Sequence, residues 1–200
     1  MSKILLLSAG TSENSGNKKA AQYALEYLEE KEIKTYLFDN LYSEIPFIQE
    51  GGLDQPDKII EIRDALIECD QIIIFSPVFN GGYASHLKNT LDWLSLAFND
   101  YKYNELFQNK KAAIVSAVLG KGGNSYDAYN SLSSQLENYG LNVFKDFYLF
   151  SSENNLDKRE KEKKQSNYIP EKGTVKLEAP TNLGTIIAKA RTTKQKTQKQ

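Results

Sequence analysis

The stretch IIIFSPVFNGGYASHLKNTLDWLSLAF, residues 72–98, indicates the fold of this chain. It opens with four apolar residues without alternation, which is typical of a strand that helices cover on both faces. Pro77 ends that strand, and apolar residues then recur at helical spacing from Leu87 to Phe98. A buried strand followed by an amphipathic helix is half of a βαβ unit, so the stretch predicts an α/β protein.

The same alternation of strand and helix continues on both sides of this stretch. Further strands are expected at residues 4–7, 33–39, 112–118 and 141–150, and further helices at residues 21–28, 59–67 and 128–139. The last of these helices is expected to stop at Gly140, because glycine is favoured just after a helix end. Right-handed crossovers between parallel strands leave few arrangements for these elements. We therefore expect a doubly wound, five-stranded parallel sheet in the order 2-1-3-4-5, with its switch point between strands one and three.

The last fifty residues differ in composition from the rest of the chain. From Asp157 onward there are 12 Lys and Arg against 5 Asp and Glu, which leaves the preceding part with a net charge of −8. High charge without periodicity is typical of a solvated, mobile segment. We expect one domain over residues 1–152 and an atypical basic C-terminal tail over residues 153–200.

The bulk composition excludes several classes of protein. The 200 residues are 40% hydrophobic and 26% charged, as in ordinary globular domains, and the net charge of −1 gives no general attraction to nucleic acid. The apolar run at residues 4–7 is too short for a signal peptide or a membrane span. Cys69 is the single cysteine, which excludes an intrachain disulfide, and we interpret it as a small buried residue at a helix end. We expect a cytoplasmic protein without nucleic-acid or membrane partners.

Glycine and small polar residues fill the three loops that follow strands one, three and four. These are the first loop, SAGTSENSGN (8–17), the second loop, SPVFNGGYAS (76–85), and the third loop, AVLGKGGNSY (117–126). Ligands of open α/β sheets bind at the carboxyl ends of the strands, beside the switch point. The three loops together therefore predict one binding site at that edge.

The first loop runs directly into a helix, and hydroxyls with free backbone N–H groups at a helix start form an anion site. Lys18 and Lys19 lie in the first turn, where a bound phosphate would offset their unfavourable position on the helix dipole. The alternative is a Ser or Asn cap with both lysines in solvent, and the residues leave both interpretations open. The loop matches neither the dinucleotide-binding glycine pattern nor the P-loop.

The second loop carries residues that suit close approach to a flat ligand. Gly81 and Gly82 keep a Cβ out of the way, and Phe79 offers an apolar face. A planar ring would then lie between the second and third loops, with a phosphate in the first. The alternative is a long turn whose glycines serve only its geometry.

The segment SPVFNGGYASHLKNTLDWLS resembles the Pro-Glu-Tyr-Asn-Gly-Ser and Leu-Lys-Asn-x-x-Asp-Trp signature of the NADPH-dependent FMN reductase family. These flavodoxin-like enzymes include azo-, quinone- and chromate-reducing members. The first loop resembles the family's Gly-Ser-x-Arg-x-x-Ser-x-Asn segment, and the third its Ser-x-x-Gly-Gly segment. The resemblance covers about residues 3 to 150 and implies a flavodoxin-like fold.

The resemblance also implies which residues bind FMN. The phosphate would be held by Ser12, Ser15 and Asn17 in a loop shaped by Gly10 and Thr11. The residues that would flank the flavin ring come from the other two loops: Pro77, Val78, Phe79, Asn80, Gly81 and Gly82 on one side, and Ser116, Gly120 and Gly123 on the other. No catalytic side chain and no metal are expected, because the flavin carries the chemistry. The chain departs from the family pattern at Glu13, where the family has Arg, and at Val78 and Phe79.

The implied function is an FMN-dependent NAD(P)H oxidoreductase of the quinone- or azo-reductase type. Hydride would pass from NADPH or NADH to FMN, and two electrons then to a small-molecule acceptor: a quinone, azo compound, metal oxyanion or free flavin. Two alternatives remain: an FMN-binding electron carrier, and a non-enzymatic partner-binding domain with a degraded flavin site.

The resemblance further implies a homodimer or tetramer. Trp93 lies off the apolar stripe of its helix, so we expect it to leave the core of the monomer and to lie at a dimer interface, the alternative being a side chain half buried under the loop at residues 99–106. His86, the lone histidine, is expected to face solvent or cap its helix rather than to act in catalysis.

Overall fold

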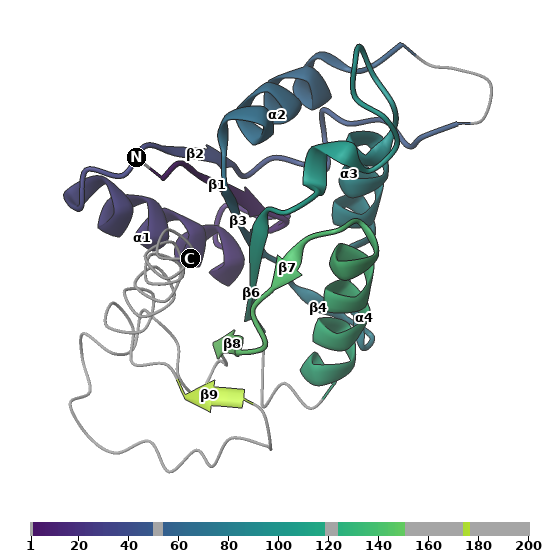
Figure 1. The fold of residues 1–200 in the computed structure, drawn as a ribbon. Helices are drawn as coiled ribbons and strands as arrows, with labels where there is room; N and C mark the ends of the chain where they lie inside the picture. The colour runs from purple at the N-terminus through teal and green to yellow at the C-terminus, as the bar shows by residue number, and fades with distance from the viewer. Residues whose placement is uncertain (1, 50–53, 119–123, 151–173, 177–200) are drawn as a thin grey trace, which may run out of the picture.

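The computed structural model describes residues 2–49, 54–118, 124–150 and 174–176 as a sheet of parallel strands with helices on both faces (Figure 1). The elements are, in chain order, β1 (Ile4–Ser8), α1 (Gly16–Glu30), β2 (Thr35–Phe38), α2 (Asp57–Glu68), β3 (Gln71–Phe75), β4 (Val78–Phe79), β5 (Gly82–Tyr83), α3 (Ser85–Ser95), the 3-10 helix η1 (Glu105–Phe107), β6 (Lys111–Ala117), α4 (Ser125–Asn138), β7 (Asn142–Val143), β8 (Phe147–Phe150) and β9 (Thr174–Lys176).

The strands of the main sheet pair in the order β2-β1-β3-β6-β8-β9, and β7 also pairs with β6. All of these pairings are parallel, and β1 lies between β2 and β3 as predicted. The chain therefore has an α/β fold whose switch point lies between β1 and β3.

The predicted order 2-1-3-4-5 needs correction at one edge of the sheet. The expected strand at 141–150 is divided into β7 and β8, because Lys145 and Asp146 interrupt its apolar run and the backbone bends at Lys145. A separate two-stranded sheet, β4 with β5, follows β3. Within the range expected to be a tail, Thr174–Lys176 forms β9 parallel to β8, which the sequence pattern did not predict.

Two apolar clusters lie on opposite faces of the sheet, and β1 contributes to both. Leu5 and Leu7 belong to the cluster that includes residues of α2, α3 and α4, whereas Ile4 and Leu6 belong to the cluster that includes α1. All four side chains are at most 1% exposed. A parallel strand that helices cover on both faces needs apolar residues at every position, which explains the lack of alternation in β1 and β3.

Two predictions about helix ends are confirmed. Gly140 follows α4 with φ of +94°, a left-handed conformation that favours glycine after a helix. Cys69 is the C-cap of α2 and is 1% exposed, and burial raises the pKa of its thiol to about 11. Among the helices in the described ranges, none has both the length and the apolar content needed to cross a membrane.

Candidate functional site

The first and second loops, with the described part of the third, meet at the carboxyl edge of the sheet. This follows from the pairing of β3 with both β1 and β6, since the carboxyl ends of parallel strands share one edge. Direct contacts join the loops there: Gly16 packs so closely on Ala117 that an added Cβ would lie 2.9 Å from the Ala117 Cβ. A Cβ added at Gly81 would lie 3.6 Å from the Asn124 Cβ. The predicted convergence of the loops is therefore present in the structure.

The first loop is tightly folded around the start of α1. Ser15 is the N-cap, and its Oγ accepts a hydrogen bond of 3.3 Å from the backbone N–H of Asn17. A Cβ at Gly10 would lie 2.3 Å from Ser15 Oγ, so this approach requires glycine. Thr11 and Ser12 are exposed, which leaves their hydroxyls accessible to a ligand. Of the predicted phosphate-binding hydroxyls, Ser15 caps the helix and Ser12 faces outward.

Asn17 joins the first loop to the end of β6. Its Nδ2 donates to the carbonyl oxygen of Ala117 at 2.9 Å, and its Oδ1 accepts from the backbone N–H of Ala117, also at 2.9 Å. The side chain is 2% exposed. The amide of Asn17 is thus used within the chain, so we assign it to positioning the first loop.

The second loop forms a β-hairpin around the Asn80-Gly81 dipeptide. Val78 and Phe79 pair in antiparallel register with Tyr83 and Gly82, and the two turn residues have φ of +52° and +80°. Positive φ at both central residues is the pattern of a type I′ turn, for which Asn-Gly is the preferred sequence. Gly82 has no such φ, and a Cβ there would make ordinary contact with Phe79 O at 3.5 Å. The Asn80-Gly81 dipeptide is a sequence signal for a hairpin. The interpretation of these residues as a loop that faces a ligand overlooked that signal.

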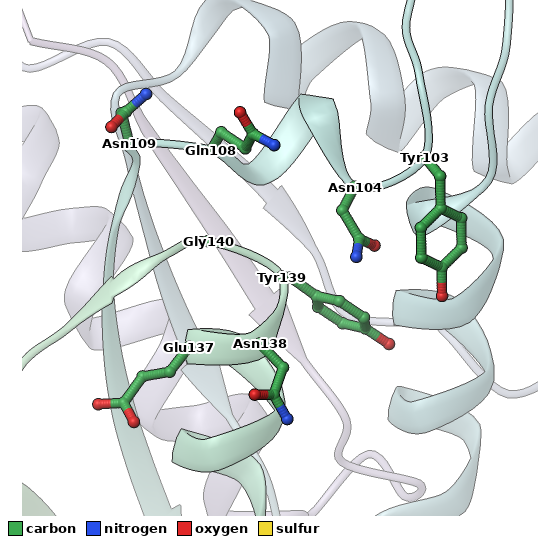
Figure 2. Close-up of a pocket in the computed structure, with 8 residues that line it drawn as sticks. All are labelled: Tyr103, Asn104, Gln108, Asn109, Glu137, Asn138, Tyr139 and Gly140. Atoms are coloured by element: carbon green, nitrogen blue, oxygen red, sulfur yellow. The ribbon is translucent and has the colours of Figure 1, made fainter.

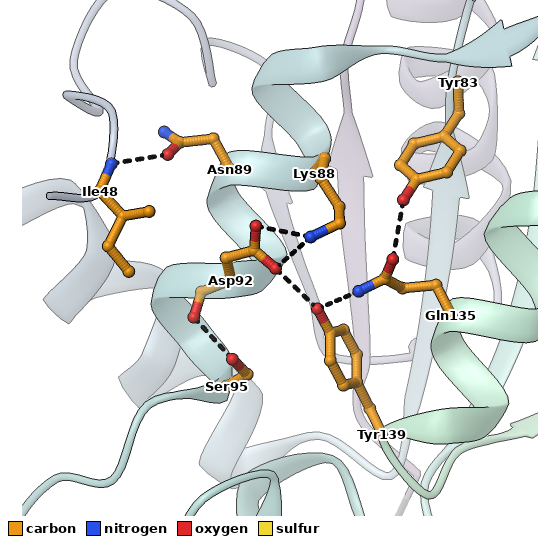
Figure 3. Close-up of polar contacts among 8 residues, drawn as sticks. All are labelled: Ile48, Tyr83, Lys88, Asn89, Asp92, Ser95, Gln135 and Tyr139. Atoms are coloured by element: carbon orange, nitrogen blue, oxygen red, sulfur yellow. Dashed lines mark hydrogen bonds and ion pairs between the residues drawn. The ribbon is translucent and has the colours of Figure 1, made fainter. Parts of the chain in front are cut away.

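A chain of hydrogen bonds holds the hairpin against α4 and α3 (Figure 3). Tyr83 donates to Gln135 Oε1 at 3.0 Å, Gln135 Nε2 donates to the Tyr139 hydroxyl, and Tyr139 donates to Asp92 Oδ1 at 2.9 Å. Lys88 Nζ completes this polar chain, at 2.6 and 2.7 Å from the two oxygens of Asp92. Burial, reinforced by the Asp92 carboxylate, raises the pKa of Tyr83 to about 12 and also raises that of Tyr139. Both phenols therefore stay protonated and act as donors.

Trp93 lies inside the chain, which corrects the expectation that it leaves the core. It is 3% exposed, and its Nε1 donates to Pro46 O at 2.8 Å. Asn89 holds the same segment: its Nδ2 donates to Pro46 O at 3.0 Å, and its Oδ1 accepts from the backbone N–H of Ile48 at 3.0 Å, the bond drawn in Figure 3. The segment after β2 covers this side of α3, so the buried face of the helix is wider than its apolar stripe.

Buried hydroxyls next to the loops escaped the sequence prediction. Ser8 ends β1 at 0% exposure, and Ser125 begins α4 at 1% exposure. Within the described ranges neither Oγ has a hydrogen-bond partner. Buried hydroxyls are usually paired, so these two are exceptions beside the loops.

None of the predicted site residues lies in the described part of the third loop, residues 117–118 and 124–126. Ser116 is 3% exposed near the end of β6. Gly120 and Gly123 lie outside the residues that the structure describes. Pro77 and Val78 are half-buried at the base of the hairpin, and Phe79 is 51% exposed on it.

His86 does not face solvent, which differs from the expectation. It is half-buried, and its Nε2 lies 2.9 Å from the carbonyl oxygen of Ala9 in the first loop. Because a carbonyl only accepts, the ring nitrogen must carry the proton of this bond.

A separate pocket of about 340 Å³ lies at the opposite, amino edge of β6 (Figure 2). Its lining is almost entirely polar: Tyr103, Asn104, Gln108, Asn109, Glu137, Asn138, Tyr139 and Gly140. Asn104 Oδ1 has no partner within the described ranges, but it is buried and so does not face the open volume. No residue of the three loops lines this pocket, so we place the candidate site at the carboxyl edge instead.

Several quinone oxidoreductases resemble this chain in sequence. An FMN-dependent NADH:quinone oxidoreductase of Burkholderia pseudomallei is 38% identical over 69 residues, which are 32% of this chain and 35% of that protein. An NADPH:quinone oxidoreductase of Arabidopsis thaliana is 35% identical over 68 residues, 34% of this chain and 32% of that protein. The chain thus matches about a third of the length of these curated relatives.

Solved structures share the fold. A flavoenzyme NAD(P)H:(acceptor) oxidoreductase from Paracoccus denitrificans superposes with a TM-score of 0.60 at 17% identity, covering 72% of this chain and 75% of that one. An azoreductase from Bacillus anthracis gives a TM-score of 0.56 at 20% identity, covering 80% and 92%. These likenesses establish the flavodoxin-like fold. The family profile described as NADPH-dependent FMN reductase matches residues 2–155, well over half of the sequence, and the chain therefore belongs to that family.

Proposed function

We propose that this chain is an FMN-dependent NAD(P)H oxidoreductase that passes two electrons to a quinone, an azo compound or a similar small acceptor. Membership of the NADPH-dependent FMN reductase family supports the reaction class. The observation that carries the proposal is that the first loop meets the end of β6, through Gly16 and Ala117, and that the hairpin meets the start of α4, through Gly81 and Asn124, at the same edge of the sheet.

The first loop suits the phosphate of FMN. Thr11 and Ser12 present exposed hydroxyls, and the start of α1 adds backbone N–H groups and a favourable dipole. Ser15, Asn17 and Gly10 give the loop its shape through the cap, the bonds to Ala117 and the close approach at Ser15.

The hairpin suits one side of the flavin ring. Residues 77–82 form a short, defined ribbon whose exposed Phe79 offers an apolar surface, while Asn80 and Gly81 make its turn. Ser116, Gly120 and Gly123 belong to the opposite side in this proposal. When bound, FMN supplies a ring that accepts hydride from the nicotinamide and gives two electrons to the acceptor. The role of the chain is to bind FMN and to orient it, so no side chain needs to act as a nucleophile.

The decisive experiment is spectroscopic. The purified protein is dialysed with FMN, its visible absorption is recorded, and it is then titrated without oxygen with NADH and with NADPH. We expect retained flavin and bleaching near 450 nm by at least one nicotinamide, followed by recovery of the colour on addition of a quinone. Bleaching only through an added reductase would indicate an electron carrier, and failure to retain FMN would favour a partner-binding domain.

We also propose that the chain forms a homodimer or tetramer in the cytoplasm. Exposed apolar side chains support an interface: Phe47 is 67% exposed and Ile48 37% exposed beside α3, and Phe79 projects from the hairpin. Trp93 is buried within one chain and so offers no surface to such an interface. Light scattering after gel filtration tests the assembly, and a monomer at micromolar concentration would contradict it.

A further inference from the structure

His86 connects the two loops that the proposed function assigns to FMN. It lies in the first turn of α3, directly after the hairpin, and its Nε2 donates to Ala9 O at 2.9 Å. The backbone N–H of Ala9 donates to Phe75 O at 2.8 Å and so joins the ends of β1 and β3. Both backbone polar groups of Ala9 are therefore held where the first loop leaves the sheet.

The base of the hairpin is fixed to the same helix. The backbone N–H of Ala84 donates to Ser76 Oγ at 3.2 Å, and the Ser76 hydroxyl donates to Pro77 O at 3.0 Å. A movement of α3 would therefore shift the hairpin together with His86. The imidazole bond to Ala9 couples that movement to the position of the first loop.

The surroundings of His86 keep its ring in a donating state. The ring of Tyr42 lies edge-on, with centroids 6.1 Å apart and an interplanar angle of 73°. Lys18 Nζ lies 6.0 Å from the centroid of the Tyr42 ring and 3.7 Å from Glu13 Oε1. Burial lowers the pKa of His86, and the bond to Ala9 opposes that shift. A neutral ring that carries its proton on Nε2 satisfies both conditions.

We propose that His86 is a positioning residue for cofactor binding: by holding Ala9, it sets the separation of the first loop from the hairpin. This inference rests on the proposed function, because it takes those two elements as the two ends of an FMN site. The residue acts through the backbone of Ala9 and needs no contact with the reacting atoms.

The test compares FMN affinity across three substitutions at this position. H86F keeps a flat ring but has no donor, H86Q places an amide N–H near the position of Nε2, and H86N is one methylene too short to reach Ala9 O. We expect the FMN dissociation constant to rise about tenfold in H86F and H86N, and to stay within about threefold of wild type in H86Q. The dissociation constants are measured by quenching of flavin fluorescence.

A matched control lies in the same helix. Thr90 is 0% exposed and its Oγ1 donates to His86 O at 2.8 Å, so T90V perturbs α3 without touching the first loop. We expect T90V to lower the melting temperature while FMN affinity stays within about twofold. A purely structural role for His86 would make H86F behave like T90V.

The outcomes separate the two proposals. Equal FMN affinity in wild type, H86F and H86N overturns the role of His86 and leaves the proposed function standing. If H86F does not fold, the comparison of H86Q with H86N decides, and equal affinities in those two overturn the role. Absence of FMN binding by the wild type overturns the proposed function, and the positioning role falls with it.

Discussion

The first loop and the hairpin meet at one edge of the sheet, but they keep their shapes by different means. The first loop depends on close approach and on long-range bonds, such as those between Asn17 and Ala117, which are 100 residues apart. The hairpin depends on its own turn at Asn80 and Gly81, and Tyr83 then attaches it to α4. One side of the candidate site is therefore specified by residues that are neighbours along the chain, and the other by the assembled fold.

The largest expected effect comes from removing the amide of Asn17. In N17A the part-buried N–H and C=O of Ala117 lose their partners, and we expect a loss of roughly 2–4 kcal/mol in the free energy of unfolding. N14A, in the same loop at an exposed position, is the control and should change stability by less than about 0.5 kcal/mol. Urea denaturation measures both. Similar values for the two variants would contradict the dependence of the first loop on β6.

A smaller effect is expected at the turn of the hairpin. Gly81 has φ of +80°, so G81A forces a Cβ into the left-handed region and should cost about 1–2 kcal/mol. G82A is the matched control, because Gly82 has no positive φ and its added Cβ meets only ordinary contact, so we expect a change within about 0.5 kcal/mol. Thermal unfolding distinguishes them. An equal cost at both glycines would argue against the type I′ turn as the determinant of this loop.

The attachment of the hairpin to α4 should contribute still less to the free energy of unfolding. Y83F removes the donor to Gln135 Oε1, and we expect a loss of about 1 kcal/mol. Y103F is the control, since Tyr103 is 61% exposed, and its expected change is below about 0.5 kcal/mol.

The same substitution also tests the alkaline behaviour of the chain. The pKa of Tyr83 is raised to about 12 in the folded chain. The stability that the protonated phenol contributes is therefore complete below the ordinary tyrosine pKa, and it is lost as the pH rises through about 12. Wild type should therefore lose more stability than Y83F on going from pH ~9 to pH ~12, as followed by circular dichroism. Parallel curves would show that the phenol of Tyr83 is not the group responsible.

The smallest expected effect is at acid pH and concerns His86. Its folded pKa is lowered by burial, so the folded chain binds fewer protons than the unfolded chain below the ordinary histidine pKa of about 6.5. The contribution of the neutral ring is present above that pH and is lost as the pH falls through the lowered pKa. The melting temperature of wild type should fall more than that of H86Q between pH ~8 and pH ~5. An equal decrease would mean that His86 does not titrate in this range.

Much of the fold was predictable because its signals are local. The apolar runs at 4–7 and 72–75 correspond to β1 and β3, and Gly140 ends α4 as expected. The break between β7 and β8 was missed, although Lys145 and Asp146 interrupt the apolar run at the point where the backbone bends. The addition of β9 depends on pairing with β8, for which its three residues carry no periodic signal.

The position of the candidate site was predictable from the sequence, but the roles of its individual side chains were less so. Parallel order alone brings the first and second loops to one edge, as the bonds of Ala9 to Phe75 and His86 show. The inward role of Asn17 could not be predicted, because it depends on the carbonyl and N–H that β6 presents to it. Trp93 was placed wrongly because a helical stripe shows which residues face the sheet, but not which loop covers the other side.

The sequence by itself determined the alternation of strand and helix, the glycine-rich loops after β1, β3 and β6, and the hairpin turn at Asn80-Gly81, since each depends on residues that are neighbours along the chain. Only the tertiary structure decided that Asn17 binds Ala117, that Trp93 is covered by the segment at Pro46, and that His86 holds Ala9. The physical reason is that a side-chain hydrogen bond across tens of residues requires two backbones to be held a few ångströms apart, and only the packed sheet and helices do that.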